Sequence, residues 1–379
     1  QGLLQQADLG LVRIFRGNAE QSVYIEALGR PHADGTVRSI LVQVDAGQMS
    51  YGNPDTTWEL SLGRGPRTTP SRAKVSVDFS DVPQAMLFYS DPRDRVASGL
   101  LLGPTRTIGE SPAREPYAKY NSAAAANRDG YSGLKGALDA IWVSHQTNFT
   151  SNNAFYNGDV GWANLQYWVR GGDAIYLERF LRYARLYARE ANVDGGAEWF
   201  KWYRTPRSHY WLTGDTRSVD WMRRVADMMY GPSSVDYRPS VTNYAIDQRF
   251  YAQTAGMSLS TWLVGGLDVY RDQAGIIFDA ILRWDGVGGT RGVAYYRDQG
   301  AVAPCTGQKA YMLGLMHAFM IEYVESAAPA RRGEFIAWLE PGLEQLWRSG
   351  DAAHSRVDPQ SPGFKYFWSP EMHAAWRAN

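Results

Sequence analysis

The feature that most constrains the fold is a repeated junction, in which an aromatic helix runs into a Gly-Asp turn and a new amphipathic helix follows. Residues 167–173 and 210–215 both show this pattern, and residues 265–268 form a looser third copy. At such a junction glycine provides the left-handed C-terminal cap of one helix and aspartate the N-cap of the next. Helical hairpins that recur in this way predict an α/α solenoid or a closed α/α toroid.

Apolar residues at helical spacing recur through the last two thirds of the chain. The predicted helices span residues 134–142, 162–170, 174–191, 208–212, 216–230, 249–264, 269–284, 307–325 and 332–349. Pro341 is expected to break the last of them. If the Gly-Asp turns all lie at one end of the hairpins, the long connections lie at the other. Loops of that length are usually functional, so we expect the site there.

The first third of the chain has a different pattern, with short and often alternating apolar runs between turn residues such as Asp34-Gly35. The predicted strands span residues 11–15, 22–27, 37–44, 58–62, 73–79 and 84–89. Such spacing predicts an antiparallel β-sandwich or barrel. Aromatic composition also changes, since 31 of the 37 Trp and Tyr residues lie after residue 120. The predicted fold is therefore α+β and multidomain: a β-domain over 1–112, a linker over 113–127 and an α/α-toroid-like helical domain over 128–379.

Charge and motif content exclude several classes of protein. Lys and Arg together number 39, as do Asp and Glu, so no long-range field gathers a nucleic acid. No apolar stretch is long enough to span a membrane. The single cysteine, Cys305, excludes an intrachain disulfide and a cysteine-based metal site. Nucleotide-binding and HExxH motifs are missing, so we expect neither a cofactor nor a metal. The start at Gln1 fits a mature chain, and we expect an extracellular protein.

The long connections are rich in aromatic, amide and charged side chains, a mixture suited to sugar rings and their hydroxyl or carboxylate groups. An alternative is that the aromatic residues form the core of the helical domain. The predicted substrate-binding residues are Trp199, Trp202, Tyr203, Arg204, Tyr244, Tyr296 and Arg297.

Two sets of catalytic residues suit two reactions. For β-elimination on a uronate, Arg207 and Arg249 would neutralise the carboxylate, and His209 or Tyr251 would act as base or acid. For hydrolysis, Glu198 and Asp247 would form the carboxylate pair. Asp159 and Asp298 are further candidate carboxylates.

Residues 30–44, with the sequence Arg-Pro-His-Ala-Asp-Gly-Thr-Val-Arg-Ser-Ile-Leu-Val-Gln-Val, resemble the N-terminal β-domain of the exo-rhamnogalacturonan lyase-like family. In that family a His-Ala-Asp-Gly-Ser-Val-Arg turn joins two strands, and Thr36 stands here in place of the serine. The aromatic helix–Gly-Asp–helix units look like those of α/α-toroid polysaccharide lyases and glycoside hydrolases. The resemblance implies an architecture and a polysaccharide partner, but it transfers no catalytic residue.

Three functions therefore stay open. The first is an extracellular polysaccharide lyase that acts on a uronate-containing glycan, and the second is a glycoside hydrolase. The third is a non-catalytic glycan-binding or self-assembling protein, such as a surface-filament or virion component.

Overall fold

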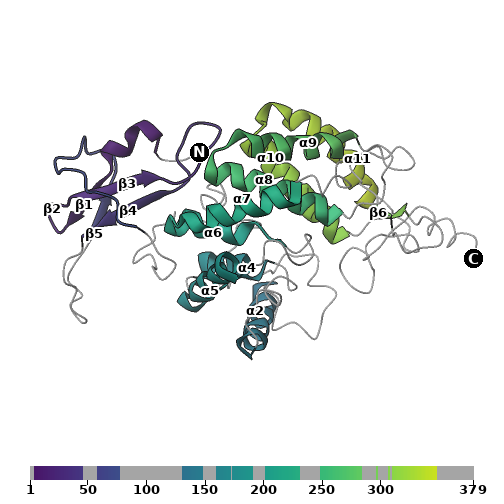
Figure 1. Ribbon diagram of the computed structural model, residues 1–379, viewed down its shortest axis with the longest axis horizontal. Coiled ribbons are helices and arrows are strands. Elements are labelled where there is room, and N and C mark those ends of the chain that lie inside the picture. Colours follow the sequence, from purple (N-terminus) through teal and green to yellow (C-terminus); the bar gives the residue numbers. More distant parts are fainter. Residues whose placement is uncertain are drawn as a thin grey trace, which may run out of the picture.

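The computed structural model describes residues 4–45, 58–76, 130–147, 159–171, 173–190, 201–230, 248–283, 296–297, 306–307 and 310–347. The chain is mostly helical, with a small antiparallel sheet region at its N-terminal end (Figure 1), so the predicted mixture of α and β structure is confirmed. The elements are η1 (Gln6–Leu11), β1 (Arg13–Arg16), β2 (Ala19–Glu20), β3 (Val23–Ala27), β4 (Ile40–Val44), β5 (Trp58–Ser61), α2 (Gly130–Thr147), α4 (Val160–Gly171), α5 (Ala174–Glu190), α6 (Arg204–Thr213), α7 (Thr216–Tyr230), α8 (Gln248–Gly265), α9 (Asp268–Arg283), β6 (Tyr296–Arg297), β7 (Thr306–Gly307), α10 (Ala310–Ser326), η5 (Pro329–Arg331) and α11 (Arg332–Trp347). The predicted linker over 113–127 lies outside the described residues.

The N-terminal strands form two small sheets rather than one. Strand β1 pairs antiparallel with both β2 and β5, and β3 pairs antiparallel with β4 from Val23↔Val44 to Ala27↔Ile40. The segment between β3 and β4 carries the turn at Gly35, whose positive φ of 81° suits glycine. Asp34 accepts hydrogen bonds from the Thr36 amide and hydroxyl, at 3.0 and 2.5 Å, so its role in this turn is structural.

Two predictions about regular structure are wrong. Residues 73–76, expected in a strand, do not join a ladder, because the side-chain amide of Gln43 bonds both backbone groups of Val75 at 2.8 Å and takes the place of a strand. The helix α11 continues through Pro341. Proline removes the bond to the carbonyl of Ala337, but both residues are exposed, so water replaces the lost donor.

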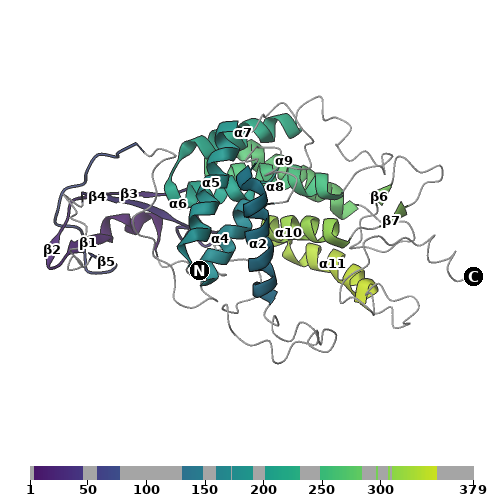
Figure 2. The same ribbon diagram turned by 90° about the horizontal axis from the view of Figure 1, so that it is seen from below.

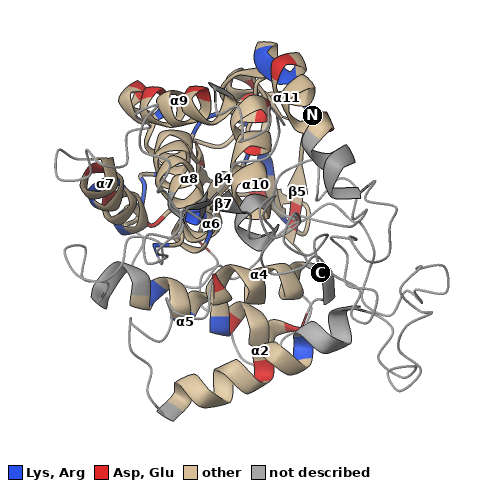
Figure 3. Cartoon of the chain, turned by 90° about the vertical axis from the view of Figure 1, so that its right-hand side faces the viewer, with Lys and Arg blue, Asp and Glu red and all other residues tan. Residues whose placement is uncertain are grey.

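The helices form hairpins set side by side in two layers. Helices α4, α6, α8 and α10 contact one another in succession, and α5, α7, α9 and α11 follow each of them as the second helix of a hairpin. Figure 3 views the helices from one end and shows the first set on the inner side of an arc and the second set on its outer side. We call these sets the inner and outer helices.

The two layers differ in burial, as their sequences require. The outer helix α7 places Val219, Met222, Val225 and Met229 in the core at i, i+3, i+6 and i+10, and exposes its opposite face. The inner helix α8 is buried at every residue from Tyr251 to Val264. A main core joins α6 to α11, and two smaller clusters join α2, α4 and α5.

The Gly-Asp junctions form caps in two of the three places. Asp173 and Asp215 accept hydrogen bonds from the amides of Ile175 and Arg217, at 3.2 and 3.0 Å, which confirms both as N-caps. Asp268 is not a cap, and that prediction is wrong. Leu267 intervenes after Gly266, so Asp268 is the first residue of α9 and its side chain bonds Arg30 and the indole of Trp262 instead.

The sheet region packs on the ends of the hairpins that carry these turns (Figure 2). Leu28 is part of the main helical core. The Arg30 amide donates to the carbonyl of Leu263 at 2.7 Å, and the Ser39 hydroxyl donates to that of Trp211 at 2.7 Å. Gly29 adopts a positive φ of 72°, and a Cβ there would lie 2.6 Å from the Leu263 oxygen, so only glycine allows this approach.

Candidate functional site

The site is organised by helix α6, which begins four residues earlier than the sequence predicted. It starts at Arg204 because Pro206, which would interrupt a helix interior, lies in the first turn, where proline is tolerated. The longer helix places Arg204, Arg207 and Trp211 on one face at i, i+3 and i+7. His209 lies on a different face.

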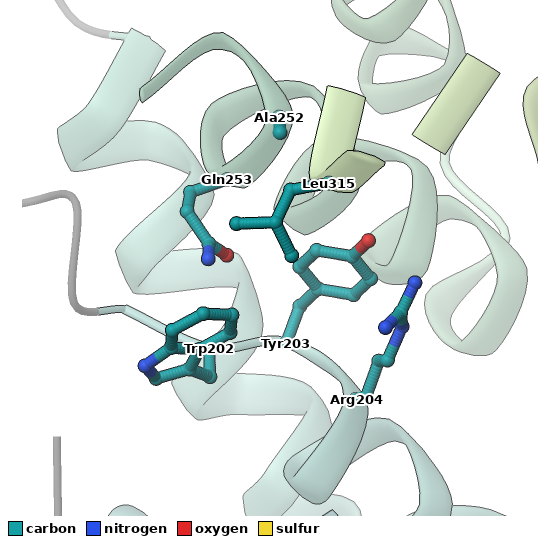
Figure 4. Close-up of a pocket in the computed structure, with 6 residues that line it drawn as sticks. All are labelled: Trp202, Tyr203, Arg204, Ala252, Gln253 and Leu315. Carbon is teal, nitrogen blue, oxygen red and sulfur yellow. The ribbon is translucent and has the colours of Figure 1, made fainter. Parts of the chain in front are cut away.

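A small pocket lies beside the N-terminal end of α6. Its lining residues come from the start of α6 and from the first two turns of α8 and α10, and they are Trp202, Tyr203, Arg204, Ala252, Gln253 and Leu315. Figure 4 shows Trp202 and Gln253 on one side and Arg204 on the other, with Tyr203 and Leu315 between them. The pocket is small, with about 10 Å³ of space for the centre of a water-sized molecule, which is roughly the room that one water needs.

Two polar atoms at the pocket have no protein partner. The side-chain oxygen Oε1 of Gln253 is buried without a hydrogen bond, in a residue that is 1% exposed, and so is Nε of Arg204. Buried polar groups in folded proteins are nearly always hydrogen-bonded, and leaving one unpaired is costly. An acceptor and a donor are therefore available to an occupant of the pocket.

Tyr203 is held rigidly in the pocket wall. Its ring packs on Gly256 of α8, where a Cβ would come within 2.2 Å of the ring. The guanidinium groups of Arg204 and Arg207 lie 5.5 and 5.6 Å from the ring centre. Burial raises the pKa of Tyr203, so its hydroxyl is protonated at neutral pH.

Asp159, predicted as a candidate carboxylate, lies at the start of α4. It accepts hydrogen bonds from the Thr205 hydroxyl and, at 3.4 Å, from the Trp162 amide. Gly161 leaves the space that Thr205 fills. Burial raises the pKa of Asp159. These contacts make Asp159 a link between α4 and α6, outside the pocket lining.

Arg207 lies one helical turn deeper than the pocket. It is 3% exposed and forms an ion pair at 2.5 Å with Glu322 of α10, and its guanidinium also donates to the Ser260 hydroxyl of α8 at 3.1 Å. Arg207, predicted to neutralise a substrate carboxylate, is therefore outside the pocket lining, and its charge is already compensated by Glu322.

His209, predicted as an acid or base, does not reach the pocket. Its Nδ1 lies 2.8 Å from the Ser218 hydroxyl of α7, and its ring lies 6.4 Å from that of Phe180 on α5. Burial lowers the pKa of His209 to about 4. His209 is a neutral residue between the two helix layers.

The two predicted catalytic residues at the start of α8, Arg249 and Tyr251, lie in different surroundings. Arg249 is half-buried and lies on the same helical face as Ala252, Gln253 and Gly256, one turn before the pocket. Tyr251 is 3% exposed in the main core, and burial raises its pKa. The structure brings Arg249 towards the pocket, and Tyr251 packs in the core.

Two of the remaining candidates lie on a short strand. Tyr296 and Arg297 lie on strand β6, opposite Gly307 and Thr306 of β7, and only their backbone is described. Residues Glu198, Trp199, Tyr244, Asp247 and Asp298 lie outside the described residues.

Sequence reasoning missed Gln253, Leu315 and Glu322. Gln253 and Leu315 are ordinary helix residues whose place depends on tertiary packing. Glu322 did carry a signal, because it is a carboxylate within an otherwise apolar stretch of α10.

In the part of the chain that the structure describes, no cluster of three or more His, Cys, Asp or Glu residues could hold a metal ion. Among those same residues, no helix has both the length and the apolar character needed to cross a bilayer. Comparisons of the chain with protein-family models, curated proteins and solved structures find no match. The site is therefore interpreted from its own geometry.

Proposed function

We propose that the protein acts outside the cell on a polysaccharide, and that it cleaves a uronate-containing glycan by β-elimination. The observation that carries this proposal is the pocket, where an indole ring, a guanidinium and a free amide acceptor meet beside a phenol. Aromatic faces stack on sugar rings, while unpaired donors and acceptors bind hydroxyl and carboxylate groups. The arc of inner and outer helices supports an α/α-toroid architecture, with the pocket at the N-terminal ends of its inner helices.

The described residues suit particular steps of this reaction. Removal of the proton next to a carboxylate requires that the carboxylate be neutralised, because the carbanion is otherwise too unstable. Arg204 and the Gln253 amide are placed for that task. Tyr203 is protonated at neutral pH and suits transfer of a proton to the leaving glycosidic oxygen. The proton removed from the carbon passes to water, since no base is among the described lining residues. These roles replace those that were expected of Arg207 and His209.

Glycan binding without catalysis, with or without self-assembly, is the second candidate. The observation that favours it is that the described pocket lining contains a proton donor but no side chain suited to act as a base. Hydrolysis has less support, because no carboxylate is among these lining residues.

A substrate screen separates these functions. The full chain is incubated with uronate-containing and with neutral polysaccharides, and products are measured by the ultraviolet absorbance of an unsaturated uronate and by new reducing ends. The lyase proposal predicts both signals with uronate glycans alone. New reducing ends without the absorbance would show a hydrolase, and retained binding without either product would exclude both enzymes.

A variant links the activity to the pocket. Gln253→Met keeps the length of the side chain and removes the free acceptor, so we expect activity and glycan affinity to fall at least about tenfold. Gln146→Met, on the exposed face of α2, is the matched control and should change neither. If Gln253→Met keeps full glycan affinity while its fold is intact, the pocket is not the glycan site.

A further inference from the structure

Two exposed apolar faces lie at the two ends of the row of described helices. Helices α2, α4, α6, α8 and α10 contact one another in succession, so α2 is the first and α10 the last of this row (Figure 3). On α2, Gly136, Ala140 and Val143 are exposed at i, i+4 and i+7, and Val143 is 64% exposed. We call these three residues the α2 face.

The α10 face has the same composition and the same spacing. It consists of Gly314, Ala318 and Ile321, of which Ala318 is half-buried and the other two are exposed, Ile321 to 41%. A Cβ added at Gly136 or at Gly314 would meet no atom within 4 Å. Both faces are therefore open at their glycines in a single chain.

The two faces lie where a surface helix normally carries polar side chains. Leu138 and His145 of α2, and Met316 and Tyr323 of α10, are buried on the side of each helix opposite to the face. The side of an amphipathic helix that points away from the core is normally polar. Exposed apolar residues are ordinary when they are scattered singly, but aligned ones indicate an interaction surface.

We propose that the α2 face of one copy packs against the α10 face of a second copy, so that the chain assembles head to tail. A second copy is favoured as the partner because the two faces fit each other in size. In an antiparallel arrangement Gly136 lies opposite Ile321, and Val143 lies opposite Gly314. Each large side chain then enters the space beside a glycine, which allows the two helices to approach closely.

The charges beside the two faces support the same arrangement. Antiparallel packing brings the start of the α2 face, preceded by Lys135, to the end of the α10 face, followed by Glu325. Glu325 is exposed and forms no ion pair with any residue that the structure describes. The Lys135 side chain is 49% exposed and pairs with Asp139 of its own helix at 2.7 Å. Such an exposed pair contributes little, so Lys135 can pair with Glu325 across the contact.

A contact between two different faces has consequences for the size of the assembly. Each copy that binds through one face still exposes the other, so association continues beyond two copies. One helix from each chain makes a contact smaller than a standard interface, so association should depend strongly on protein concentration.

The first test measures association of the full chain by sedimentation velocity over a wide range of concentration. The average mass of the wild type should rise past that of a dimer. Val143→Asp and Ile321→Glu each place an unpaired charge in the contact and should weaken association at least about tenfold. Val269→Asp is the matched control, because Val269 is 55% exposed on the outer helix α9, and it should leave association unchanged.

Mixing variants tests whether the two faces meet. Val143→Asp keeps an intact α10 face and Ile321→Glu keeps an intact α2 face, so an equal mixture should form a dimer and nothing larger. A disulfide is the second measurement, in chains whose native cysteine is removed by Cys305→Ser. Ala140→Cys and Ala318→Cys should give a cross-linked dimer when they are mixed under oxidising conditions, and neither should do so alone.

Three outcomes would overturn the inference. The first is a wild-type chain that stays monomeric at every concentration. The second is an Ala140→Cys chain that cross-links with itself as readily as with Ala318→Cys, which would show that like faces meet. The third is a double variant with both cysteines that cross-links within a monomer, which would show that the two faces close on each other in one chain.

Discussion

Helices α8 and α9 form one hairpin but belong to different environments. Every residue of α8 from Tyr251 to Val264 is buried, whereas α9 is buried along one face and exposes Val269 and Ile276. The inner helix is also rich in small and hydroxyl residues, and the outer helix has larger apolar residues on its buried face.

The difference shows what each layer requires. An inner helix is approached from all sides, so small residues such as Gly256 make room for neighbours. One buried hydroxyl, that of Thr261, donates to the Met257 carbonyl of its own helix at 2.8 Å. An outer helix needs only one apolar stripe. Polar groups that stay unpaired on the inner helices, such as the Gln253 oxygen, are therefore candidates for ligand contact.

The largest effect is expected from the buried stripe of the outer layer. Phe278 of α9 is fully buried and packs against the ring of Tyr323, with ring centres 4.7 Å apart. Phe278→Ala should lower the free energy of unfolding by about 3–5 kcal/mol, the usual cost of such a cavity. Val269→Ala, on the exposed face of the same helix, should change it by less than about 0.5 kcal/mol. Urea unfolding measures both, and similar losses would contradict the one-sided burial of α9.

Acid should weaken the contact between the layers through His209. The folded protein holds His209 neutral, because burial lowers its pKa from 6.5 to about 4. Stability present above pH 6.5 is therefore lost as the pH falls towards 4, by up to about 3 kcal/mol. The charged groups near His209 are Asp215, Arg185 and Arg217, and their opposing effects are smaller than that of burial.

His209→Gln isolates this contribution. The free energy of unfolding is measured between pH 7 and pH 4 for wild type and variant, and the variant should show the shallower loss. His32, whose pKa burial also lowers to about 4, is present in both proteins and cancels in the difference. Parallel curves would show that His209 is solvated in the folded protein.

A single methyl group should distinguish a glycine that packs against Tyr203 from a glycine with open space around it. Gly256→Ala places a Cβ within 2.2 Å of the Tyr203 ring, so we expect a loss of about 1–3 kcal/mol in stability and loss of glycan binding. Gly333→Ala, on the outer helix α11, meets no atom within 4 Å and should stabilise by about 0.5–1 kcal/mol. If both substitutions stabilise, the ring of Tyr203 does not need the space above Gly256.

Local patterns predicted the helices well and the site only in part. The amphipathic stripe of α7 and the caps at Asp173 and Asp215 follow from neighbouring residues, so the sequence was sufficient for them. It failed at Asp268, where one inserted residue moved the aspartate to a partner 238 positions away. The pocket could be expected near Trp202, Tyr203 and Arg204. Its remaining wall, formed by Ala252, Gln253 and Leu315, depends on helix packing that no local pattern reveals.

The contacts of Arg30 have a consequence for how the chain folds. Its guanidinium pairs with Asp268 at 2.8 Å, so the sheet region completes its contacts with α8 and α9 only after more than two thirds of the chain has been synthesised. Pairings across such long separations are slow, because the loop between them must be closed first. During synthesis the contacts between the N-terminal region and helices α8 and α9 form only after those helices have been made. A truncation before α8 would expose the side chain of Leu28, which is buried in the folded protein, and so favour aggregation.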